Sequence, residues 1–146
     1  MSDNPFTKIV NDTLMTTSKI DKAIADLEIY LEQASEALNT SIIGPNHIKL
    51  TTNVPDNTLP AISSLMISFM STNQKGKKYI YLTNDIKSEM IAGWAVSEDG
   101  DSMSLIINKL KSSYPVSEEG YIKSIGELLT TTSIMDKAIE LRKEVI

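Results

Sequence analysis

Apolar residues near the beginning of the chain recur at the spacing of one helix face. A first set follows Pro5, and a longer seam after Ser18 advances in alternating steps of four and three residues. The first set is Phe6, Ile9, Val10 and Leu14, and the seam is Ile20, Ile24, Leu27, Leu31, Ala34 and Leu38. Such steps place side chains on one side of a helix, so the pattern predicts a helical region over 1–40, with a helix of about 20 residues after Ser18.

The middle of the chain, 47–111, changes to short runs rich in β-branched residues and separated by turns. Strands are predicted over 47–54, 79–83 and 90–96, a short helix over 84–90, and a returning strand or short helix over 103–110. The run 61–71 fits both strand and helix spacing, but the polar turn after it favours the strand of a hairpin. The pair Asp99-Gly100 marks a second tight turn. These runs predict about five strands.

A second helical region follows, over 117–146. Ser117 precedes Glu118 and Glu119, an arrangement typical of a capped helix start with acidic residues in its first turn. The predicted buried face of this helix consists of Ile122, Ile125, Leu128 and Leu129. Strands grouped between helices are typical of α+β folds. We therefore predict one α+β domain over 1–146, with a mostly antiparallel sheet in the middle of the chain, flanked by N- and C-terminal helices.

The two ends of the chain resemble one another in sequence. Aligning 2–31 with 117–146, at a constant offset of 115, gives ten identities in 30 positions. The densest part is T-T-S-x-x-D-K-A-I, at 16–24 and again at 131–139. Ser18 and Ser133, each with an aspartate three residues on, are predicted N-caps, so each T-T-S marks a helix start or a break between two helical pieces. Shared ancestry, a shared packing role and chance all remain open explanations.

Composition and charge exclude several classes of function. The 146 residues hold 14 Lys plus Arg against 19 Asp plus Glu, a formal net charge of −5. That balance, with Arg142 the single arginine, argues against nucleic-acid binding. Because no cysteine and one histidine are present, thiolate chemistry and multi-histidine metal sites are excluded. No secretory signal or bilayer-length apolar run is visible, so we expect a cytoplasmic protein without membrane insertion, with signal-independent export left open.

The polar residues form no recognisable catalytic motif. His47 lacks the sequence context of a nucleophile, and a solvent-facing or hydrogen-bonded histidine is the favoured interpretation. Glu98, Asp99 and Asp101 lack the spacing of a calcium loop, which favours a solvated turn. The glycines are isolated and form no phosphate-binding loop. We expect no enzyme activity, no cofactor and no metal.

The predicted order of elements, the size and the acidity resemble the small bacterial chaperones of type III secretion effectors. The resemblance implies a helix, three strands, a helix, two strands and a final helix, which build a dimer that binds an extended segment of another protein. The long N-terminal helical region and the end-to-end repeat depart from that family.

We therefore expect a non-enzymatic chaperone or adaptor that receives a partner segment on an apolar helix or sheet-edge surface, with a basic partner favoured by charge. The candidate partner-binding residues are Ile24, Leu27, Leu31, Met66, Met70 and Trp94. Core packing is the commoner role for the tryptophan and the methionines, whereas the helix seam fits core packing and a homodimer interface equally well.

Three other functions stay open. One is a toxin-neutralising immunity protein whose acidic face covers a basic active site. Another is a filament or secretion-apparatus subunit that assembles through its terminal helices. A hydrolase is the least favoured, because no pair among the 19 acids is distinguished by the sequence.

Overall fold

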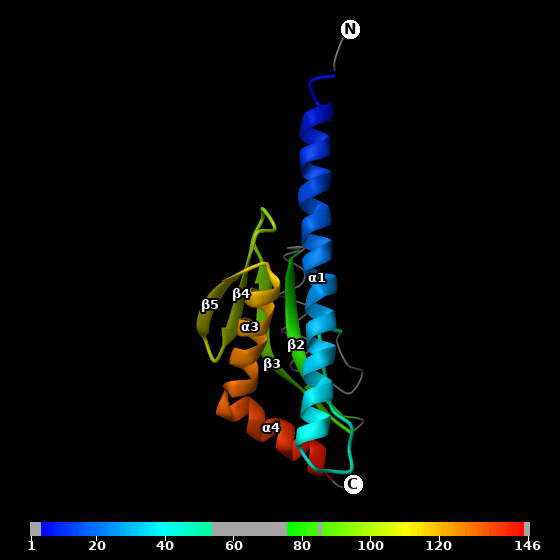
Figure 1. Cartoon of the computed structure of the whole chain (residues 1–146), viewed down its shortest axis with the longest axis vertical. Coiled ribbons are helices and arrows are strands. Elements are labelled where there is room, and N and C mark those ends of the chain that lie inside the picture. Colours follow the sequence, from blue (N-terminus) through cyan, green and yellow to red (C-terminus); the bar gives the residue numbers. More distant parts are fainter. Residues whose placement is uncertain (1–3, 54–75, 85, 145–146) are drawn as a thin grey trace.

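The computed structural model describes residues 4–53, 76–84 and 86–144. Along the chain, helices form the N- and C-terminal parts of the described residues, and the strands of an antiparallel sheet come between them (Figure 1). The elements are α1 (Thr7–Ser41), β1 (Lys49–Thr51), β2 (Lys77–Thr83), β3 (Ser88–Val96), β4 (Ser102–Ile107), β5 (Leu110–Pro115), α3 (Glu118–Thr130) and α4 (Thr132–Lys143). The predicted α+β class, with five antiparallel strands in the middle of the chain, is confirmed.

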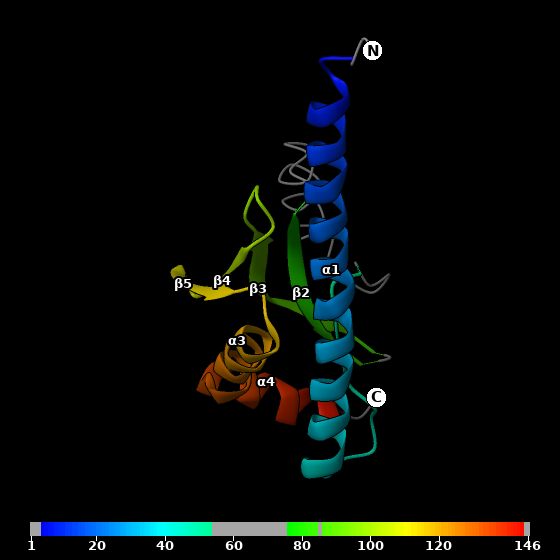
Figure 2. The same ribbon diagram turned by 45° about the horizontal axis from the view of Figure 1, so that its top comes forward.

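Helix α1 is one unbroken helix of 35 residues, and only its C-terminal part lies beside the sheet (Figures 1 and 2). The predicted helix start at Ser18 is wrong, because this residue lies in the interior of α1. Neither glycine nor proline occurs between Phe6 and Ile43 to interrupt the helix. The Thr13 and Thr16 hydroxyls donate to carbonyl oxygens four residues back, at 2.8 and 3.1 Å, and cap nothing.

The second T-T-S segment does mark a break between two helices. Thr131 is both the C-cap of α3 and the N-cap of α4. Ser133 is therefore not the predicted N-cap but lies inside α4, and no side chain caps that helix start. The aligned residues Ala23 and Ala138 are both buried. The T-T-S sequence, however, lies within one helix near the N-terminus and at a junction between two helices near the C-terminus.

Helix α3 begins as predicted. The Ser117 hydroxyl oxygen accepts a hydrogen bond from the backbone N–H of Gly120, at 3.1 Å. The prediction that Ile122 belongs to the buried face is wrong, since its side chain is exposed and that of Tyr121 is buried instead. Of the other predicted residues, Ile125 and Leu128 belong to the core, and Leu129 is partly buried against it.

The strands follow one another in sheet order, β1-β2-β3-β4-β5, and every pair is antiparallel. No helix forms over the described part of 84–90: the Asn84 side-chain oxygen accepts from the backbone N–H groups of Ile86 and Lys87, and β3 starts at Ser88. Of the two alternatives predicted over 103–110, the returning strand is the one that forms: it is β4, which ends at Ile107 and is followed by a turn at Asn108-Lys109 and the start of β5. The predicted strand over 61–71 lies outside the described residues.

One core joins the sheet to the three described helices, α1, α3 and α4. Leu27 and Leu31 of α1 are almost completely inaccessible to solvent, as is Trp94 of β3, whose indole N–H points at the Met103 sulfur 3.3 Å away. Figure 2 shows α3 and α4 on one face of the sheet and α1 beside β2. A polar side chain of α1 also binds the backbone of β1: the Ser35 hydroxyl oxygen accepts a hydrogen bond from the Leu50 N–H at 2.8 Å.

The sole arginine ties the last helix to the end of the first. The Arg142 guanidinium donates to the carbonyl oxygens of Asn39, Ile42 and Asn46. The first two carbonyls belong to the C-terminal end of α1, where backbone acceptors lack partners within the helix. The fold gives this arginine a structural role, because a planar five-donor group can satisfy several carbonyls at once.

Replacing Arg142 by lysine tests this link. An ammonium group is a compact point donor that cannot serve three separated carbonyls, so we expect Arg142→Lys to lower the free energy of unfolding by about 1–3 kcal/mol. Chemical denaturation measures the change, and the exposed neighbour Lys143→Ala is the control. Equal stabilities of the two variants would contradict the role of the guanidinium.

The β4–β5 turn gives a prediction of opposite sign. Asn108 and Lys109 have φ values of +50° and +70°, as a two-residue type I′ hairpin requires. A side chain at the second position is strained, so Lys109→Gly should raise the free energy of unfolding by about 0.5–1 kcal/mol. Lys109→Ala keeps the Cβ atom and should give no such gain in the same denaturation experiment.

Candidate functional site

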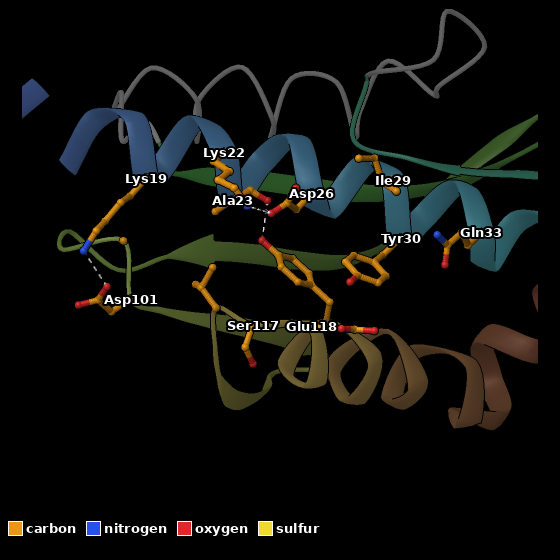
Figure 3. A pocket seen from close by; sticks show the side chains of 13 residues that line it. Lys19, Lys22, Ala23, Asp26, Ile29, Tyr30, Gln33, Asp101, Ser117 and Glu118 are labelled. Atoms are coloured by element: carbon orange, nitrogen blue, oxygen red, sulfur yellow. Dashed lines mark hydrogen bonds and ion pairs between the residues drawn. The ribbon is translucent and has the colours of Figure 1, made fainter. Parts of the chain in front are cut away.

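An open cleft lies between α1 and the start of α3 (Figure 3). Its volume is about 530 Å³, and the turn between β3 and β4 closes one end. The side chains that line it include Lys19, Lys22, Asp26, Ile29, Tyr30, Asp101, Glu118 and Tyr121. Three separate parts of the chain therefore meet in one hollow.

Two stacked tyrosine rings form the floor of the cleft. The ring centroids of Tyr30 and Tyr121 lie 4.9 Å apart, with 13° between the ring planes. The Tyr121 hydroxyl donates to the carbonyl oxygen of Ala23 at 2.7 Å, a contact between α3 and α1. Burial raises the pKa of Tyr121 well above its usual value. The capped start of α3 and this hydrogen bond together fix the aromatic floor.

The rim carries charges of both signs. Lys19 pairs with Asp101 of the β3–β4 turn at 3.1 Å, and Lys22 pairs with Asp26 one helical turn on at 2.9 Å. The hydrogen bond from Lys22 to Asp26 raises the pKa of that lysine. Gly100 allows the turn to approach α1, because its φ is +79° and a Cβ atom there would lie 2.8 Å from the Lys19 Cβ.

An exposed isoleucine supplies the apolar part of the rim. Ile29 is 53% exposed, beside the half-buried Tyr30. The cleft can therefore accept an apolar side chain over the tyrosines and charged groups around it. Such a mixed lining suits a polypeptide segment.

The other singled-out polar residues lie elsewhere. His47 is exposed, and its Nε2 atom lies 3.2 Å from the Asn39 side-chain nitrogen. Asp99 accepts hydrogen bonds from Ser97 and from the Asp101 N–H within the β3–β4 turn, and these lower its pKa. Among the described residues, no group of three or more His, Cys, Asp or Glu side chains is placed to hold a metal ion.

Three of the six predicted partner-binding residues do not reach the surface. Leu27, Leu31 and Trp94 are core residues, and Ile24 is partly buried against that core. In this conformation they support the core-packing interpretation, because their apolar surface is already covered within the chain. Met66 and Met70 lie outside the described residues.

Sequence reasoning missed the residues of the cleft. Tyr30 borders the four-and-three seam of α1, whereas Ile29 lies on the opposite side of the helix, so neither residue continues the seam. An apolar Ile29 opposite the seam was the one available signal, since a helix with a single buried face needs no apolar residue there. Tyr121 was hidden because its burial depends on where α3 meets α1.

A second exposed apolar surface lies at the other end of α1. Every residue from Asn4 to Met15 is exposed, including Phe6, Ile9, Val10 and Leu14. Figures 1 and 2 show this part of the helix projecting beyond the sheet. We call Thr7–Met15 the free segment of α1.

Comparison with protein-family models, with curated proteins and with solved structures found no match to this chain. None of the helices in the described ranges combines the length and apolarity that a membrane span requires. The cleft and the free segment are therefore interpreted from their own geometry.

Buried tyrosines make the stability of the fold sensitive to alkaline pH. Burial raises the pKa of Tyr81 to about 12, and that of Tyr121 is also raised. A tyrosine in the unfolded chain ionises near pH 10, so above that pH the unfolded chain loses protons that the folded chain keeps. Ionisation of these two tyrosines should therefore leave the free energy of unfolding unchanged below about pH 9 and lower it above pH 10.

Tyr121→Phe isolates one of these groups. At pH 7 the variant should be less stable by about 1–2 kcal/mol, because the hydrogen bond between the Tyr121 hydroxyl and the Ala23 carbonyl is lost. Above pH 10 its stability should fall less steeply, by up to about 1.4 kcal/mol per pH unit. Urea denaturation at a series of pH values measures both effects, and an unchanged slope would contradict the burial of this hydroxyl.

Proposed function

We propose that the chain is a non-enzymatic, protein-binding adaptor or chaperone that receives a segment of another protein in the cleft between α1 and α3. The observation that carries the proposal is the cleft itself, which combines a stacked-tyrosine floor, the exposed Ile29 and a charged rim. Aromatic residues that are already held in place bind at low entropic cost and are enriched where binding energy is concentrated.

The charges around the cleft indicate the chemistry of the segment. Lys19 and Lys22 are each paired with a carboxylate, whereas Glu118 adds a further negative charge on the α3 side. The whole chain also carries a net charge of −5. We therefore propose a segment with an apolar anchor residue flanked by lysine or arginine, the anchor lying over Ile29 and Tyr30.

An immunity protein remains the second candidate, and one observation favours it. Glu28, Glu32 and Glu36 succeed one another at single-turn spacing on α1 and line a separate hollow of about 610 Å³ with His47 and Lys49. A row of carboxylates is the kind of surface that would cover a basic active site. Under this alternative, partner binding depends on the glutamate row and not on the cleft.

Two matched isoleucine variants test the cleft. Peptides are selected from a random 12-residue library against the folded chain, and their affinities are measured by fluorescence anisotropy. We expect the selected peptides to share an apolar residue next to lysine or arginine. Ile29→Lys should weaken binding at least about tenfold, because it places a charge over the apolar floor. Ile122→Lys changes an isoleucine of similar exposure, 58%, that lies outside the cleft, and should leave the affinity unchanged.

A second matched pair tests the charge preference. Glu118 and Glu119 both lie in the first turn of α3, but only Glu118 lines the cleft. Glu118→Gln should weaken binding of the basic peptides about two- to fivefold at low salt and less at high salt, whereas Glu119→Gln should not. Peptides that bind equally well to all four variants, or selection that yields no peptide, would refute the cleft as the binding site.

A further inference from the structure

The free segment of α1 presents an apolar face with no covering in the part of the chain that the structure describes. With about 100° of rotation per residue, Val10, Leu14 and the N-cap residue Phe6, which directly precedes the free segment, lie within about 80° of one another around the helix. Ile9 borders this face, and Thr13 and Thr17 fill it. We call this surface the free apolar face. A helix in water derives most of its stability from packing such a face, so the free segment alone is marginal.

The charged residues of the free segment avoid this face. Lys8 and Asp12 lie on the far side of the helix, about 160° from Val10 in either direction. An uncharged face can meet a copy of itself without like-charge repulsion. The absence of charge here contrasts with the cleft, whose rim carries five charged side chains.

We infer that the free apolar face is covered by the same face of a second copy of this chain, with the two helices antiparallel about a two-fold axis at Val10. In this register Phe6 of each copy faces Leu14 of the other, and the two Val10 residues face one another. A two-fold contact of this kind is closed, since the same patch serves both copies.

The position of the sheet favours the antiparallel arrangement. It leaves the two folded bodies at opposite ends of the helix pair, whereas a parallel pair would bring them side by side. In the proposed register Asn4 of one copy lies opposite Thr16 of the other, three residues before Lys19, where α1 first pairs with the β3–β4 turn. The overlap therefore uses the free segment and stops where the folded body begins.

The size of the face predicts a weak dimer. Phe6, Ile9, Val10 and Leu14 are each more than half exposed, and together offer on the order of 300–400 Å² of apolar surface per copy. Two copies would bury less than the roughly 1,200 Å² typical of stable interfaces, so we expect a dissociation constant in the micromolar range or weaker. The inference does not rest on the proposed function, but it would give an adaptor two clefts far apart.

Sedimentation equilibrium of the full chain from about 1 µM to 1 mM, the range in which an interface of this size dissociates, tests the dimer. We expect a monomer–dimer equilibrium that Val10→Asp weakens at least tenfold, because it places two carboxylates on the axis. Met15→Asp is the control: Met15 is as exposed as Val10, at 64% against 52%, but lies about 140° away around the helix. Circular dichroism confirms that both variants fold. A chain that stays monomeric, assembles into larger species, or responds equally to both variants would overturn the inference.

Single cysteines test the direction of the helices, since the natural chain has none. Val10→Cys should form a disulfide-linked dimer under mild oxidation, because residue 10 faces its own copy. Phe6→Cys should not link to itself but should link to Leu14→Cys in a mixture of the two variants. Efficient self-linking of Phe6→Cys would show a parallel pair and would contradict the proposed geometry. None of these measurements depends on peptide binding in the cleft, so this inference and the proposed function can fail separately.

Discussion

The structure depends on one mismatch: the apolar stripe of α1 is longer than the sheet beside which it packs. Its C-terminal part, around Leu27 and Leu31, completes the core, and its N-terminal part projects into solvent. Burial of apolar surface is the main favourable term in folding, so the covered part holds α1 to the domain. The uncovered part has the same kind of side chains and the same reason to be covered. Both proposals made above follow from what this one helix leaves exposed.

Directional contacts fix where along α1 the sheet and the other helices sit. Apolar packing alone would allow the helix to slide by a turn, but hydrogen bonds at three levels prevent it. The Tyr121 hydroxyl binds the Ala23 carbonyl, Ser35 binds the Leu50 N–H, and Arg142 binds carbonyls at the helix end. These contacts set the boundary between the buried and the free part of the stripe. They also place Tyr121 against Tyr30, so the cleft is a consequence of the same alignment.

Local patterns predicted the elements well and their partners poorly. The Ser117 cap follows from a rule that acts within one element and was foreseen, whereas Trp94, a candidate partner-binding residue, is buried in the core. The motif that contains Ser18 also contains Ser133, yet only its second copy spans a helix junction, at Thr131, because the neighbours that decide this are distant in sequence. Strand β5 was missed since Asn108-Lys109 lacks the glycine that usually marks such a turn. The cleft could not be predicted, because its floor joins residues 91 positions apart.

Hydrogen–deuterium exchange along α1, measured at low and at high protein concentration, tests the central claim most directly. The backbone amides between Ala23 and Leu38 should be protected at both concentrations, since the core covers this part of the helix. The amides of Thr7–Met15 should exchange rapidly in dilute solution and become protected as the concentration rises. Equal protection of both parts in dilute solution would mean that the domain itself covers the whole stripe. That result would contradict the division of α1 into a buried part and a free part.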